Sequence, residues 1–157
     1  MPQDDNGSLE KSRIFIMSMA ARLVLVVLAC LSAMLPGIAT AADTPDQAAV
    51  RKVLMDTYDT PQSHLVVDPV VIGADRALAG WTQGQRGGVA MFTRKPGGWR
   101  LSLCGNDMVT QADNLVLTGM APADAQALSE AFTTAARRSP MERRALFRTF
   151  GETVRME

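Results

Sequence analysis

The chain has 157 residues, of which 47% are hydrophobic, and its 16 Lys plus Arg balance its 16 Asp plus Glu. Balanced charge gives no electrostatic reason to expect nucleic acid or an anionic membrane surface as a partner. The length suits a single domain with a core of modest size.

The first forty residues have the three-part pattern of a secretory signal peptide. Arg22 precedes an apolar run over residues 23–35, and Ala39-Thr40-Ala41 supplies the small residues of a cleavage site. The run is shorter than the ~20 apolar residues that span a bilayer. We therefore expect residues 1–41 to be an N-terminal extension and a signal peptide cleaved after Ala41. Residues 42–157 would then form one periplasmic domain, with no stable membrane insertion.

Two details of this segment stay open. Translation could begin at Met1, Met17 or Met19, because the residues before Met17 are polar and mixed in charge. Cys30 follows a small residue, as in lipoproteins, but the apolar run continues past it. Cleavage after residue 41 would leave Cys104 as the last cysteine, so the exported domain would have no internal disulfide.

The domain begins with a predicted helix over residues 45–58. The run Thr44-Pro45-Asp46-Gln47 has the capping-box spacing, with proline at the first helical position. Residues 64–72 then predict the first strand. Because Pro69 removes one backbone donor, this strand should lie at a sheet edge or contain a bulge.

Three further strands are predicted from short apolar runs separated by turns that contain glycine and proline. They cover residues 77–82, 89–94 and 99–104, with turns at residues 84–88 and 95–98. In the last strand Trp99, Leu101 and Leu103 would share one face, and the alternate residues, including Cys104, would share the other. This period of two predicts a meander with one buried face and one more open face.

Three helices are predicted after the sheet. Asp107 is a candidate N-cap for the first, which would run to Val116. Pro122 opens the second, and Ser139-Pro140-Met141-Glu142 repeats the capping-box pattern before the third. Residues 151–157 could add an extended segment.

These elements predict an α+β fold with an N-terminal helix, a four-stranded antiparallel meander in sequence order, and C-terminal helices packed on one sheet face. The architecture is loosely cystatin-like, which by itself settles no function.

Cys104 is the first candidate for a functional side chain. It ends a predicted strand just before a helix start, where free backbone N–H groups favour a thiolate. A thiolate is a soft ligand suited to Cu(I), and Met108, four residues on, could add a thioether. The alternative is that Cys104 is a small apolar filler, since free cysteine is commonly buried.

His64 is the only histidine of the chain and a candidate metal ligand or base. In a meander it would lie three strand spacings from Cys104, roughly 14 Å away, which disfavours a joint site. We see no paired carboxylates, Ser-His-Asp set or phosphate loop, and so expect no enzyme. Trp81 and Trp99 either anchor the core or line a cavity.

Several short stretches carry a resemblance to a known family. They are Val67-Asp68-Pro69-Val70-Val71, Ala79-Gly80-Trp81, Arg86-Gly87-Gly88, Gly98-Trp99, Leu103-Cys104-Gly105 and Thr153-Val154-Arg155-Met156. On these stretches the chain resembles the bacterial copper uptake system-associated proteins. The resemblance covers most of the chain after residue 41. It implies an exported protein encoded with copper acquisition components, and no established activity or ligand set.

The sequence therefore leaves two main hypotheses. The first is a periplasmic accessory protein of copper uptake that binds Cu(I) transiently or contacts a copper transporter or chaperone. The second is a periplasmic small-molecule-binding module with no metal role. A cavity enzyme would need a converging acid/base pair, and none is visible. The exposure of Cys104 should help to separate the first two.

Overall fold

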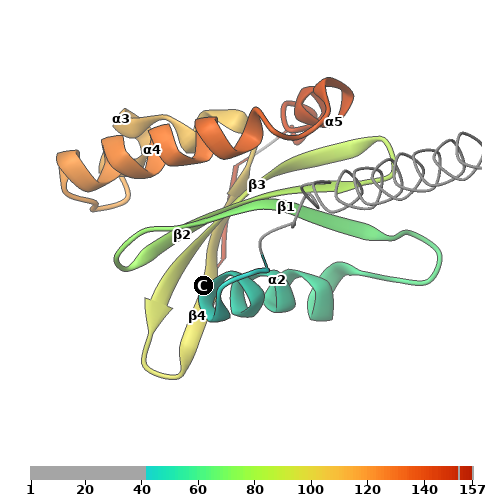
Figure 1. The fold of residues 1–157 in the computed structure, drawn as a ribbon, viewed down its shortest axis with the longest axis horizontal. Helices are drawn as coiled ribbons and strands as arrows, with labels where there is room; N and C mark the ends of the chain where they lie inside the picture. Colours follow the sequence, from blue (N-terminus) through green and yellow to red (C-terminus); the bar gives the residue numbers. More distant parts are fainter. Residues whose placement is uncertain (1–41, 152, 157) are drawn as a thin grey trace, which may run out of the picture. The chain divides into compact units, whose positions relative to one another are not determined.

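The computed structural model describes residues 42–151 and 153–156, which form a five-stranded antiparallel sheet with helices on both faces (Figure 1). The predicted signal peptide lies outside the described residues. The elements, in chain order, are α2 (Pro45–Tyr58), β1 (Leu65–Ile72), β2 (Arg76–Gln83), β3 (Arg86–Lys95), β4 (Gly98–Gly105), η1 (Asp107–Thr110), α3 (Ala112–Val116), α4 (Pro122–Ala136), α5 (Met141–Leu146) and β5 (Val154–Arg155). The predicted α+β class is confirmed.

The first helix, α2, begins as its sequence predicts. The Gln47 backbone N–H donates to the Thr44 hydroxyl at 3.3 Å, and the Gln47 side chain accepts from the Thr44 N–H at 2.9 Å. This reciprocal pair is a capping box, and Pro45 lacks the N–H that a first helical turn leaves without a partner. Val50 and Leu54 form the buried stripe of α2, which packs on the sheet.

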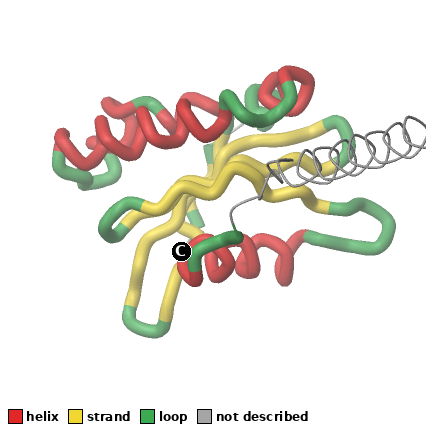
Figure 2. The backbone as a smooth tube through the Cα atoms, viewed as in Figure 1, coloured by secondary structure: helices red, strands yellow, loops and turns green. Residues whose placement is uncertain are grey.

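The sheet order is β1-β2-β3-β4-β5, so β1 is an edge strand. Figure 2 shows the strands in yellow between the helices of the two faces. Its register with β2 shifts between Val67 and Val70, around the cis Asp68-Pro69 bond. The expectation for Pro69 of an edge strand or a bulge is met on both counts. The strand β3 starts earlier than predicted. Gly87 and Gly88, which were expected in the turn, pair with β2, so only two residues form the turn.

A bulge in β4 changes which face Cys104 occupies. Met91 pairs with Leu103 and the next residue, Phe92, pairs with Leu101, which leaves Ser102 as the extra residue. The Ser102 hydroxyl donates to the Met91 carbonyl at 3.0 Å. The side chain of Cys104 therefore lies on the same face as that of Trp99, and the predicted simple alternation along this strand is wrong.

Both sheet faces carry a hydrophobic core, so the prediction of one more open face is also wrong. We call the cluster under α2 the α2-side core; its buried members are Val50, Leu54, Leu65, Val67, Val70, Ala77, Ala79, Ala90, Phe92, Trp99 and Cys104. The cluster on the other face is the α4-side core, with Leu78, Val89, Met91, Leu103, Val109, Leu115, Met120, Ala125, Leu128, Phe132 and Phe147. The C-terminal helices cover this second face (Figure 1).

Two predicted helix starts differ in the structure. Asn106, not Asp107, caps η1 by accepting from the Met108 N–H at 3.0 Å, and a break at Gln111 separates η1 from α3. Ser139 makes no capping hydrogen bond to α5. Its hydroxyl instead donates to an Asp68 carboxylate oxygen at 3.0 Å, because the β1 bulge brings that acceptor within reach.

After α5 the chain passes from one face of the sheet to the other. The first residues of β3 extend past the end of β4. There the Gly87 N–H donates to the Thr149 hydroxyl at 2.9 Å. Phe147, just before this contact, belongs to the α4-side core, and Phe150, just after it, packs against the α2-side core. The tail then adds β5 beside β4, so the predicted extended segment is the fifth strand.

Candidate functional site

A cavity of about 410 Å³ lies on the α2 side of the sheet. Its apolar and sulfur-bearing wall comprises Leu54, Leu65, Trp81, Cys104, Phe150 and Met156. Polar groups from Tyr58, Ser63, Gln83 and Arg86 complete the lining. Pockets that bind small molecules have this size and this mixture of apolar walls with few polar groups.

The C-terminal tail forms one side of the cavity because glycine leaves room for it. A Cβ at Gly88 would stand 3.0 Å from the Phe150 Cβ and 3.1 Å from the Trp81 ring. The two aromatic rings meet edge to face, with their centroids 5.4 Å apart. The Gln83 amide, at the end of β2, donates to the carbonyls of Tyr58 and Ser63 at 2.9 and 2.7 Å, which fixes the end of α2 and the loop after it to β2.

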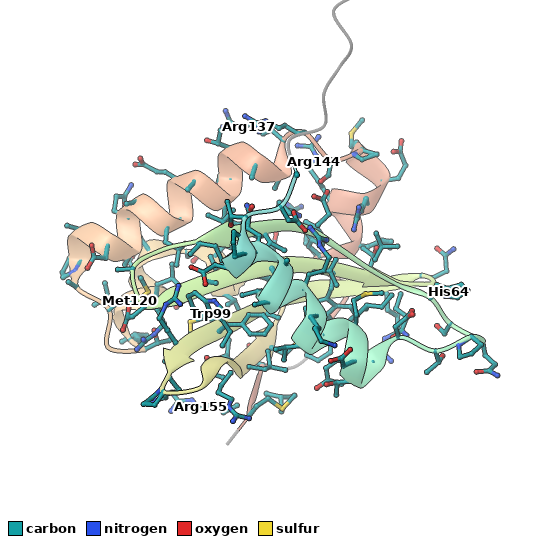
Figure 3. All side chains as sticks on the ribbon, turned by 60° about the horizontal axis from the view of Figure 1, so that its bottom comes forward. His64, Trp99, Met120, Arg137, Arg144 and Arg155 are labelled. Carbon is teal, nitrogen blue, oxygen red and sulfur yellow. The ribbon has the colours of Figure 1, made fainter. Side chains whose placement is uncertain are left out.

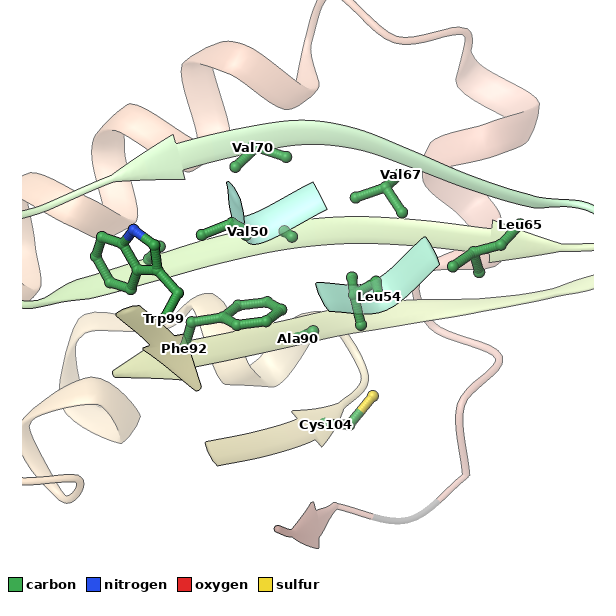
Figure 4. Close-up of a cluster of buried hydrophobic side chains, with 11 residues drawn as sticks. Val50, Leu54, Leu65, Val67, Val70, Ala90, Phe92, Trp99 and Cys104 are labelled. Carbon is green, nitrogen blue, oxygen red and sulfur yellow. The ribbon is translucent and has the colours of Figure 1, made fainter. Parts of the chain in front are cut away.

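Cys104 is a free thiol and is buried, with 7% of its surface exposed, so the exposure that would favour the copper hypothesis is not present in this conformation. Figure 4 shows it on β4, toward the end of the α2-side core that lies away from Trp99. Burial raises the pKa of the Cys104 thiol above its ordinary value. The Trp81 indole N–H and the Gly105 backbone N–H oppose this rise, although no hydrogen bond of ordinary geometry joins the indole to the sulfur.

Met156 is the functional candidate that sequence reasoning missed. Cys104 pairs with Val154 across β4 and β5, and the Met156 N–H donates to the Ser102 carbonyl at 3.0 Å. Since Val154 and Met156 are two residues apart, they share a strand face, and the Met156 side chain lines the same cavity as Cys104. The alternation of the tail was visible in the sequence, but its pairing with β4 was not.

Met108 lies elsewhere. It is 49% exposed, and its sulfur accepts from the Gln111 amide at 3.2 Å. It lines a separate hollow of about 240 Å³ with Leu103 and Val109, both members of the α4-side core. Although it follows Cys104 by only four residues, the structure does not bring the two sulfur atoms into one site.

His64 is also outside the cavity lining. Its side chain is 78% exposed at the start of β1, and its Nδ1 lies 3.6 Å from an Asp59 carboxylate oxygen (Figure 3). In the described part of the chain, no three His, Cys, Asp or Glu side chains come together in a way that could hold a metal ion. Among the residues that line the cavity with Cys104, Met156 is the one other that carries sulfur.

Within residues 42–151 and 153–156, no helix has the length and apolar character to cross a membrane. No protein-family model, curated protein or solved structure matches the chain.

Proposed function

We propose that this chain is an exported, periplasmic accessory protein of copper uptake that binds Cu(I) transiently through Cys104 and Met156. The observation that carries the proposal is that the thiol and a thioether line one cavity, although they lie 52 residues apart in the sequence. Thiolate and thioether sulfur are the soft ligands that select Cu(I) among the common metal ions. The resemblance to the copper uptake system-associated proteins supports the same cargo.

A site with two sulfur ligands suits the transfer of Cu(I) to a partner better than its long-term storage. The ion would be held by few bonds in a cavity whose other walls are hydrocarbon and aromatic, so a partner with more ligands could remove it. We propose that this partner is a copper transporter or chaperone. Because burial favours the protonated thiol, each Cu(I) bound would release the Cys104 proton.

The tail gives the cavity a means of opening. Met156 is held through two residue pairs between β4 and β5 and one further backbone hydrogen bond, and both β5 residues are exposed. Segments with few buried contacts open at low free energy. Movement of this short strand would expose Cys104 and carry the Met156 sulfur with it.

The test is an anaerobic Cu(I) titration of the reduced, signal-free protein (residues 42–157), which lacks Cys30, against a chromophoric Cu(I) chelator. We expect one Cu(I) per chain, abolished by Cys104→Ala and weakened at least about tenfold by Met156→Leu, which keeps the apolar volume and removes the sulfur. Met108→Leu is the matched control and should leave the affinity unchanged. Equal affinity for the wild type and Cys104→Ala would reject this site.

A further inference from the structure

Arg86 lines the cavity and has no part in the proposed Cu(I) site. We propose that the cavity also binds a small organic carboxylate with an apolar body, such as a medium-chain or aromatic acid. The chain would hold the carboxylate at Arg86 and the apolar body between α2 and the tail. This proposal does not depend on copper, because none of its contacts uses sulfur.

The size of the cavity sets the size of the ligand. A water molecule takes about 30 Å³ of liquid volume, so about 410 Å³ corresponds to roughly fourteen water-sized groups. Leu54, Leu65 and Phe150 give most of this space a hydrocarbon or aromatic boundary. An aliphatic or aromatic body of that size would bury its surface there, which is favourable in proportion to the apolar area removed from water.

The charge of Arg86 determines which polar head group of a ligand the cavity would favour. Arg86 is exposed, lines the cavity, and forms no ion pair with any of the residues that the structure describes. No other charged side chain of the described residues contributes to the lining, so among them Arg86 alone brings a charge to the cavity. A guanidinium presents paired N–H donors that match a carboxylate. An anionic head group at this position is therefore favoured over a neutral or cationic one.

The Trp81 ring lines the cavity where the apolar body of the ligand would lie. Its indole N–H is buried, forms no hydrogen bond of ordinary geometry, and acts on the Cys104 sulfur. A ligand that packs against the ring would change the surroundings of this N–H, so its signal reports whether the cavity is filled.

The probes are decanoate and 1-decanol, which have nearly the same apolar body and differ in charge. Binding is followed by the two indole N–H signals in ¹⁵N–¹H NMR spectra, with Trp99→Phe assigning them. We expect decanoate to shift the Trp81 signal and leave the Trp99 signal in place. For a ligand of this size the Kd should be about 0.01–1 mM.

Arginine variants distinguish a contact with the carboxylate from non-specific hydrophobic binding. Arg86→Gln should weaken decanoate about fivefold to tenfold and leave decanol unchanged, whereas Arg100→Gln, an exposed arginine outside the cavity, should change neither. Cys104→Ala should still bind decanoate, even though it loses the proposed Cu(I) site. Equal binding of decanoate and decanol to the wild type, or no shift of the Trp81 signal, would overturn the proposal whatever the result with copper.

Discussion

The indole N–H of Trp99 donates to the Asp46 carboxylate at 3.0 Å, which joins the first turn of α2 to the start of β4. Arg94 completes the contact, since it pairs with the same carboxylate and its guanidinium lies 4.3 Å from the centre of the Trp99 ring. The α2-side core is thus closed at this end by a cluster of three side chains.

Trp99→Ala should lower the free energy of unfolding by about 3–5 kcal/mol, because the ring is 95% buried and fills the end of the α2-side core. Urea denaturation followed by circular dichroism would measure the loss. Leu117→Ala is the control, since Leu117 is 78% exposed and its truncation should change stability by less than about 0.5 kcal/mol. A similar small effect for Trp99→Ala would mean that the ring is not a core residue.

The Asp46 carboxylate should make the free energy of unfolding depend on pH in the acid range. Hydrogen bonds from Arg94 and then Trp99 lower the pKa of Asp46 below its ordinary value. Its contribution is therefore present above about pH 4 and is lost as the pH falls through the lowered pKa. Denaturation between pH 6 and pH 2 should show wild type and Asp46→Asn converging in stability at the acid end. A constant difference across this range would contradict the contribution of the charge.

The elements that the sequence predicted well depend on neighbours in the chain. The capping box of α2 needs only Thr44 and Gln47, and the break in β1 needs only Pro69, which carries no N–H. Such local chemistry can be inferred without knowing what lies across the sheet.

The features that were mispredicted depend on residues that are distant in sequence. Ser102 forms a bulge in which its hydroxyl bonds to Met91 on the neighbouring strand, and this extra residue moves Cys104 to the other face. Met156 reaches the cavity only because the tail crosses the sheet and pairs with β4. A periodicity along one strand cannot reveal a bulge or the partner of a two-residue strand.

Ser139 illustrates the same limit and gives a prediction. Its hydroxyl bonds to Asp68 across 71 residues and makes no contact as a helix cap, so Ser139→Ala should destabilise by about 1–2 kcal/mol. A double-mutant cycle with Asp68→Ala, which removes the acceptor, should show coupling between the two sites, because they share one hydrogen bond. Additive losses, with no coupling, would indicate that Ser139 acts through the helix instead.

Gly88→Ala should weaken the packing of the tail on β3. A glycine with open space around it should accept alanine without this effect. The added Cβ would lie 2.5 Å from the Gly105 carbonyl oxygen, so the strand or the tail must move. We expect a loss of about 2–4 kcal/mol in the free energy of unfolding and faster hydrogen exchange at Met156. Gly151→Ala has no neighbour within 4 Å and serves as the control. Equal stability of the two variants would contradict the packing of the tail on β3.

The raised pKa of Cys104 predicts how the thiol titrates. A thiol reagent should modify it slowly in the folded protein at neutral pH, and faster as the pH rises above 9. The stabilisation by the buried neutral thiol is present below the ordinary thiol pKa and is lost as the pH rises through the raised value. Cys104→Ala should remove this alkaline loss. Apparent Cu(I) affinity should rise about tenfold per pH unit while the thiol is protonated.

X-ray absorption spectroscopy of the Cu(I)-loaded, reduced protein tests the copper proposal most directly. We predict a first shell made of sulfur, with contributions from both Cys104 and Met156. Met156→Leu should remove one sulfur neighbour, and Met108→Leu should leave the spectrum unchanged. A first shell of nitrogen or oxygen, or a spectrum that is the same in Cys104→Ala, would show that copper does not bind in this cavity.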